Sequence, residues 1–70
     1  MKYVVIYERA NNGYSAYIPD LPGCVAAGDT LDEVKRLIRS ACKMHLDAMR
    51  RDGDEIPEPT TQSDYLELAS

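Results

Sequence analysis

The hydrophobic pattern of the chain changes once, close to Thr30. Before that point, short segments rich in Val, Ile, Tyr and Ala at residues 2–8, 14–18 and 25–27 are separated by turn-forming residues, which predicts three strands. After it, apolar positions recur at steps of three and four residues from Leu31 to Met49, which predicts one amphipathic helix. The pattern therefore indicates an α+β domain.

The ends of the predicted helix carry capping signals. Thr30 followed three residues later by Glu33 is a capping box, and acidic residues are favoured near the positive end of the helix dipole. Arg50 and Arg51 complement the opposite end, and Gly53 can take the left-handed conformation that stops a helix. We therefore expect a single helix of about 21 residues.

The loop between the first two strands decides which side chains share a face of the sheet. A two-residue Asn-Gly turn groups three alternate side chains of the first strand with Ala16 and Ile18, namely Tyr3, Val5 and Tyr7. A three-residue Asn-Asn-Gly loop, with Gly13 in the left-handed conformation, instead groups Val4 and Ile6 with the same pair. The second register is favoured, because its aliphatic face suits a covering helix.

That register leaves a second face that no helix covers. Its members are aromatic or β-branched: Tyr3, Val5, Tyr7 and Tyr17. Tyrosine is enriched at protein interfaces, because its ring is readily buried while its hydroxyl stays hydrated. This face is therefore a candidate surface for another protein or for a second copy of the chain.

Beyond the helix, two prolines within three residues exclude a helix or a central strand, so residues 54–59 form an acidic, extended crossover. The alternating segment from Tyr65 to Leu68 is expected to return as a fourth strand, parallel to the first. The resulting order of elements is β-β-β-α-β, with a four-stranded sheet of order 3-2-1-4 and one helix on one face.

Composition limits the possible functions. The 70 residues suffice for one domain, and no segment resembles a signal peptide or a membrane span, so a cytoplasmic location is expected. Cys24 and Cys42 are then expected to be reduced thiols. The net charge of −4 disfavours direct contact with DNA or RNA and favours a basic protein as partner.

Few residues of the chain are candidates for catalysis or metal binding. The acids nearest the strand ends are Glu8, Asp20 and Asp29, but nothing in the pattern brings them together for a two-metal site. Cys42 and His45 have a plausible ligand spacing, with Cys24 as a third group, yet no fourth ligand is evident. We therefore expect no catalytic residue, no metal and no cofactor.

The basic residues of the helix suggest nucleic acid only at first sight. They alternate with acidic residues at the spacing of helical ion pairs, so a solvated face explains them more simply. The basic set consists of Lys35, Arg36, Arg39, Lys43, Arg50 and Arg51.

The run GYSAYIPDLPGCVAAGDTLDEV, from Gly13 to Val34, joins a Gly-Tyr turn exit, a Pro-Asp-Leu-Pro-Gly-Cys loop and a Gly-Asp-Thr-Leu helix start. In this order the chain resembles the HicB family of antitoxins over about residues 2 to 59. The resemblance implies a partial ribonuclease-H-like fold for residues 1–70 as a single HicB-like domain. It also implies a non-enzymatic antitoxin that neutralises a small, basic HicA-type ribonuclease.

The resemblance makes acidic mimicry of RNA the expected mechanism, with masking of the toxin surface and with homodimers or larger homo-oligomers. The expected interface residues are Tyr3, Val5, Tyr7, Tyr17, Asp20, Asp54, Glu55 and Glu58. Many HicB proteins have a further C-terminal DNA-binding segment for which this sequence leaves no room, so direct DNA binding is not expected. The alternative is a stand-alone oligomeric domain that binds another protein or a small ligand.

Overall fold

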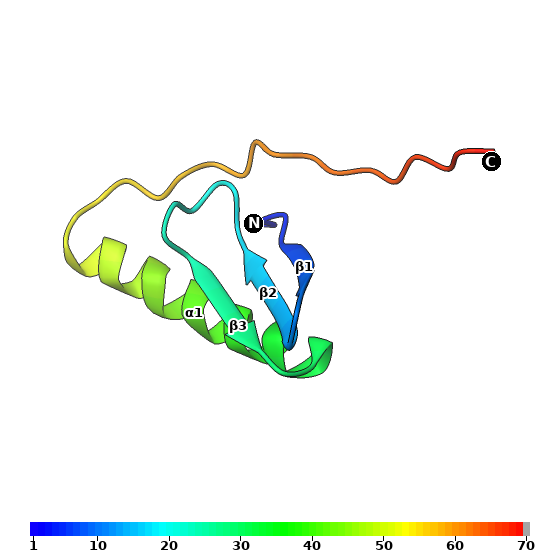
Figure 1. The fold of residues 1–70 in the computed structure, drawn as a ribbon. Coiled ribbons are helices and arrows are strands. Elements are labelled where there is room, and N and C mark those ends of the chain that lie inside the picture. Colours follow the sequence, from blue (N-terminus) through cyan, green and yellow to red (C-terminus); the bar gives the residue numbers. More distant parts are fainter. Residues whose placement is uncertain (70) are drawn as a thin grey trace.

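The computed structural model describes residues 1–69 and contains one sheet covered on one face by one helix (Figure 1). The strands are β1 (Ile6–Ala10), β2 (Gly13–Tyr17) and β3 (Val25–Gly28), and the helix is α1 (Leu31–Arg51). The three strands are antiparallel neighbours in the order β1-β2-β3. The α+β class and the order of the first four elements are therefore as the sequence predicts, but β1 covers Ile6–Ala10 instead of the expected residues 2–8.

Both ends of α1 have the predicted caps. The Thr30 hydroxyl accepts a hydrogen bond from the backbone N–H of Glu33 at 3.1 Å, which satisfies one of the free donors of the first turn. At the other end, Gly53 has φ of 76°, and the N–H of Asp54 donates to the carbonyl oxygen of Met49 at 2.8 Å. The helix thus begins and ends where its sequence signals lie.

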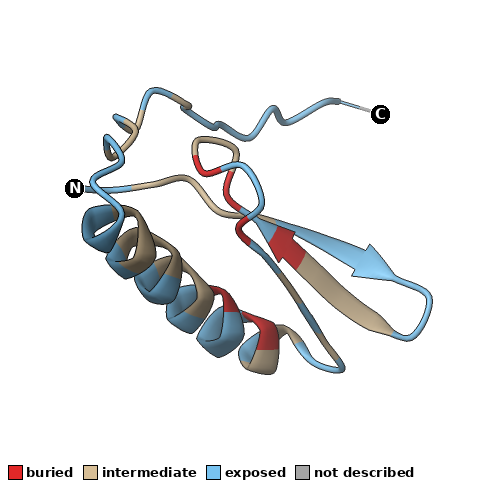
Figure 2. Cartoon of the chain, turned by 90° about the vertical axis from the view of Figure 1, so that its left-hand side faces the viewer, coloured by how far each residue is buried: buried red, intermediate tan, exposed pale blue. Residues whose placement is uncertain are grey.

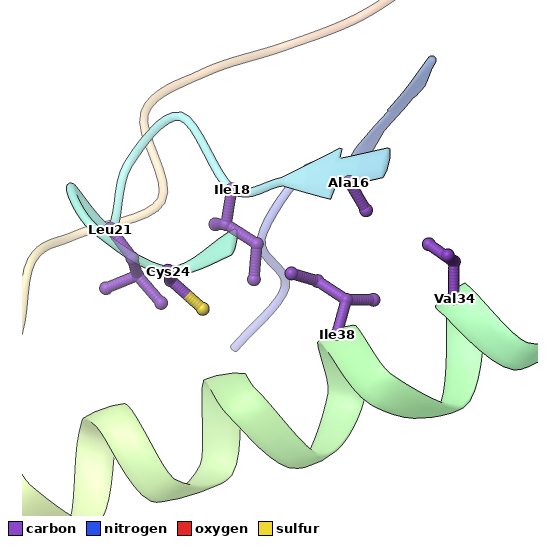
Figure 3. Close-up of a cluster of buried hydrophobic side chains, with 6 residues drawn as sticks. All are labelled: Ala16, Ile18, Leu21, Cys24, Val34 and Ile38. Atoms are coloured by element: carbon purple, nitrogen blue, oxygen red, sulfur yellow. The ribbon is translucent and has the colours of Figure 1, made fainter. Parts of the chain in front are cut away.

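The core lies between α1 and the half of the sheet formed by β2, β3 and their connecting loop. Six side chains are fully buried, and they point toward one another in Figure 3: Ala16, Ile18, Leu21, Cys24, Val34 and Ile38. Figure 2 shows that β1 and the C-terminal residues contribute none of this buried set. The helix packs chiefly against β3 and β2, so the core lies to one side of the sheet.

The favoured hairpin register is wrong. Ala10 pairs with Gly13, so the turn consists of Asn11 and Asn12, and Tyr7 lies directly opposite Ala16. Paired residues point to the same side of a sheet, so Tyr7 shares the helix-facing side with Ala16. Tyr7 and Ala16 also share a face in the register that was not favoured. That register, however, has Asn12 and Gly13 in its two-residue turn, whereas the structure has Asn11 and Asn12.

A glycine is required at position 13 for a different reason from the one expected from the sequence. Gly13 does not take the left-handed conformation, which among residues 1–69 occurs only at Gly23 and Gly53. Instead, a Cβ atom at Gly13 would collide with the backbone carbonyl oxygen of Gly28. A glycine is needed here because the start of β2 passes close to the end of β3.

The predicted fourth strand is absent from the sheet of residues 1–69, which has three strands instead of the order 3-2-1-4. Residues 54–69 instead form an extended tail that crosses the loop between β2 and β3 and then leaves the body of the molecule (Figure 1). Tyr65 to Leu68 have no strand partner in the described part of the chain. No helix within residues 1–69 is long and apolar enough to span a bilayer.

Candidate interaction surfaces

A groove of about 860 Å³ lies between residues 3–7 and one side of α1. One wall consists of Tyr3, Val5 and Tyr7, whose spacing of two residues places them on the helix-facing side of the first strand segment. We call this surface the tyrosine groove. It exists because α1 packs against β2 and β3 and leaves the underside of β1 uncovered.

The opposite wall of the tyrosine groove is basic. It is formed by long side chains of α1, and no acidic residue lines the groove: the lining cations are Lys35, Arg36, Arg39, Lys43 and Arg50. Of these, Arg50 alone forms an ion pair within residues 1–69, with Asp47 at 3.4 Å on the exposed surface. The other four cations form no ion pair within residues 1–69, so the expectation that ion pairs account for this basic face does not hold for them.

Tyr3 connects the groove to the C-terminal tail. Its hydroxyl donates a hydrogen bond of 2.6 Å to the carbonyl oxygen of Pro57. Burial raises the pKa of the Tyr3 hydroxyl above its ordinary value, and the nearby Cys42, Glu58 and Asp20 act in the same direction. Tyr3 is therefore a neutral donor that holds the crossover against the start of the chain.

Asp20 anchors the tail at a second point. Its carboxylate accepts hydrogen bonds from the backbone N–H of Thr61 at 3.1 Å, the Thr61 hydroxyl at 2.8 Å and the Thr60 hydroxyl at 3.2 Å. The Thr61 N–H, followed by the Thr61 and Thr60 hydroxyls, lowers the pKa of this carboxyl below its ordinary value. The charge of Asp20 is thus engaged by the chain itself.

The other predicted acidic residues remain exposed. Asp54, Glu55 and Glu58 lie on the crossover that follows α1, and no ion pair or hydrogen bond within residues 1–69 involves their side chains. The crossover carries no basic residue, so its negative charge is presented to solvent without compensation. This segment is therefore an acidic surface open to a partner.

Tyr17 lies apart from the other predicted tyrosines. It pairs with Ile6 on one side and Val25 on the other, so these three side chains form a row on the face of the sheet turned away from the helix. Tyr17 is 39% exposed and Val25 is 63% exposed. The structure therefore divides the predicted tyrosine face into the groove and this open row.

The groups considered for chemistry do not converge. Within residues 1–69, no three His, Cys, Asp or Glu side chains lie close enough to hold a metal ion. Cys24 and Cys42 are free thiols, and burial, together with the neighbouring Cys42, raises the pKa of Cys24. Cys24 belongs to the core, as expected for a small buried side chain.

The spacing of the basic residues in the sequence already places them along one side of the helix, although it does not show that they line a groove. Arg36, Lys43 and Arg50 are spaced by seven residues, and Lys35, Arg39 and Lys43 by four, so each set follows one side of a helix. The buried Leu21 had no comparable signal, because its burial depends on the loop folding back over α1.

Comparison with known proteins places this geometry in context. A family described as HicB-like antitoxin of bacterial toxin–antitoxin systems matches residues 3–68. An uncharacterised 14.9 kDa protein of Haemophilus phage HP1 is 36% identical over 66 residues, which cover 94% of this chain and 50% of the phage protein. Antitoxin HicB 2 of Photorhabdus laumondii is 31% identical over 64 residues, covering 91% of this chain and 46% of that protein.

The fold has a solved counterpart. A chain in the structure of a HicA3 and HicB3 toxin–antitoxin complex superposes with a TM-score of 0.73 and 27% identity, over 86% of this chain and 70% of that chain. The present chain spans about half the length of the two curated relatives named above.

Proposed function

Because the chain belongs to the HicB-like antitoxins of bacterial toxin–antitoxin systems, we propose that it binds and neutralises a small HicA-type ribonuclease that cleaves mRNA. The observation that carries the proposal is the likeness, over 86% of the chain, to a chain from a solved HicA3 and HicB3 complex. The family comprises antitoxins rather than enzymes. In this proposal the chain acts by binding and supplies no catalytic group.

The acidic crossover is the proposed contact with the toxin. Asp54, Glu55 and Glu58 are exposed and uncompensated, so they can occupy positions that RNA phosphates take on a basic ribonuclease. Asp20 acts indirectly, since its bonds to Thr60 and Thr61 hold the crossover in place. Masking of this kind excludes RNA both by shape and by charge.

We propose further that the protein works in the cytoplasm as a homodimer or larger homo-oligomer and does not itself contact DNA. The net charge of −4 supports the last point, because an overall excess of acidic residues repels the phosphates of DNA. The sheet order 3-2-1-4 also belongs to this proposal, with Tyr65 to Leu68 paired beside β1 only after association.

The proposal is tested by coexpression with a HicA-type ribonuclease encoded beside this gene. We expect the chain to restore growth and to copurify with the ribonuclease. Failure to restore growth, with both proteins present at comparable levels, would overturn the proposal.

The role of the crossover is tested with single charge reversals. Glu55→Lys and Glu58→Lys should each slow association with the ribonuclease, by up to about tenfold at low salt, while dissociation changes less. Glu8→Lys is the matched control, because Glu8 is exposed on β1 and makes the same change of net charge elsewhere. Equal association rates for all three variants would exclude the crossover as the contact.

A further inference from the structure

We propose that residues 62–69 of one chain add as a strand beside β1 of a second copy and place alternate side chains, those of Leu66 and Leu68 among them, in its tyrosine groove. We call residues 62–69 the projecting segment. This contact would be the interface of the self-association proposed above, and the inference rests on that proposal. It does not require binding of a toxin. It is tested on the purified chain, so its failure and failure of the antitoxin proposal can be told apart.

The projecting segment has the properties of a strand without a sheet. Its apolar side chains are almost fully exposed: Tyr65 by 99%, Leu66 by 84% and Leu68 by 73%. Among the described residues, its one hydrogen bond joins the N–H of Tyr65 to the adjacent Asp64 carboxylate at 2.8 Å. A segment with this much exposed apolar surface and so many free backbone groups is suited to pairing with a sheet edge.

The receiving site is the edge of the sheet next to the groove. β1 lies at one end of the order β1-β2-β3, so its outer backbone groups have no strand partner within residues 1–69. The helix-facing side of this edge opens into the tyrosine groove, because α1 covers β2 and β3 instead. A strand added beside β1 would therefore find backbone partners at the edge and an apolar recess beneath it.

The charges of the two surfaces are opposite. The groove is lined by five cations and no acidic residue, whereas the projecting segment has no basic residue and carries Asp64 on the same strand face as Leu66 and Leu68. Four of these cations lack an acidic partner within residues 1–69. The basic groove attracts the acidic projecting segment. It repels a basic ribonuclease, the partner proposed for the acidic crossover, so charge complementarity favours the projecting segment as the occupant of the groove.

A second copy fits the geometry better than the segment's own sheet. Asp20 and Tyr3 fix residues 57–61 at the end of the sheet, and from there the projecting segment runs clear of both sheet and helix in the two views of Figures 1 and 2. Eight extended residues reach about 26 Å, enough to follow the five residues of β1 on a neighbouring molecule, about 17 Å. Mutual exchange between two copies closes a symmetric dimer.

The first test measures the mass of the full chain in solution. We expect a dimer for the natural sequence and a monomer for the double variant Leu66→Asp with Leu68→Asp at the same concentration, with unchanged helical circular dichroism. Ser63→Asp adds a charge to the same segment at a polar position and should remain dimeric. A monomeric natural chain, or a double variant that stays dimeric, would overturn the inference.

The second test identifies the contact. Cys42 lines the groove, so Leu68→Cys should form a disulfide with Cys42 on mild oxidation. In a mixture of isotopically labelled and unlabelled chains, peptides joined across the two labels would show that the link connects different copies. Val25→Cys, on the opposite face of the sheet, should give no link to Cys42. Links confined to peptides of one label would show that the segment folds back on its own chain and would overturn the inference.

RNA is the competing occupant of a basic groove with tyrosines. A fluorescent single-stranded RNA should show no change in anisotropy at concentrations where the chain is dimeric. Binding of this RNA that Arg39→Glu abolishes and that Leu66→Asp with Leu68→Asp leaves intact would assign the groove to RNA and overturn the inference.

Discussion

Thr61 donates both its backbone N–H and its hydroxyl to the carboxylate of Asp20, which lies 41 positions earlier in the chain. The bonds, 3.1 and 2.8 Å long, join the tail to the Pro- and Gly-containing loop between β2 and β3. Hydrogen bonds to a charged acceptor are stronger than those between neutral groups. A single side chain in a turn thus fixes where the C-terminal segment leaves the domain.

Attachment of the tail should depend on pH through Asp20. The pKa of Asp20 is lowered in the folded chain, so the attachment is fully present above the ordinary Asp value of about 3.9 and is lost as the pH falls through the lower folded value. The Thr61 amide resonance should therefore shift at acidic pH by nuclear magnetic resonance. Asp20→Asn should remove this titration, whereas Asp64→Asn, a substitution in the exposed tail, should preserve it.

The Tyr3 hydroxyl should contribute measurably to stability. Tyr3→Phe removes the donor to the Pro57 carbonyl oxygen and leaves that partly buried acceptor without its partner, which should cost about 0.5–1.5 kcal/mol in urea denaturation. Tyr17→Phe is the control, because the Tyr17 hydroxyl has no hydrogen bond among residues 1–69 and its ring is 39% exposed. Equal losses in the two variants would contradict a role for the bond.

Two adjacent helix positions should differ sharply on truncation. Ile38 is 2% exposed and belongs to the core, so Ile38→Ala should lower the free energy of unfolding by about 2–5 kcal/mol. Leu37 is 42% exposed, and Leu37→Ala should cost less than about 1 kcal/mol. Chemical denaturation of both variants checks the side of α1 that meets the sheet.

Gly13 should not tolerate a side chain. Gly13→Ala places a methyl group against the carbonyl oxygen of Gly28, so the strands must shift, at a cost of about 1–3 kcal/mol. Asn12→Ala changes the neighbouring exposed turn residue and should have a much smaller effect on the thermal midpoint. A stable Gly13→Ala variant would show that the approach of β2 to β3 is not tight.

Local signals in the sequence sufficed for the helix. Thr30, Glu33 and Gly53 act through hydrogen bonds within a few residues, so their types and spacing determine the ends of α1 without knowledge of the rest of the fold. The positions of β2 and β3 followed in the same way from β-branched and aromatic segments between turns, whereas β1 begins four residues later than expected, at Ile6.

The register and the site needed information from distant residues. Asn-Asn-Gly is compatible with several turns, and the contact that decides among them is the approach of Gly13 to Gly28, which belongs to another strand. The tyrosine groove depends on where α1 crosses the sheet, and the fate of the tail depends on Asp20 and Tyr3. None of these long-range contacts has a spacing that marks it in the sequence.

The off-centre position of the core has a consequence for how such a protein can diverge. All six fully buried side chains come from β2, the loop between β2 and β3, and α1, and none comes from β1. Mutations along the first strand and the basic side of the helix can therefore alter recognition without dismantling the scaffold. The side with the core can keep the fold constant during evolution, while the side with β1 and the basic face of α1 can vary as the binding partner varies.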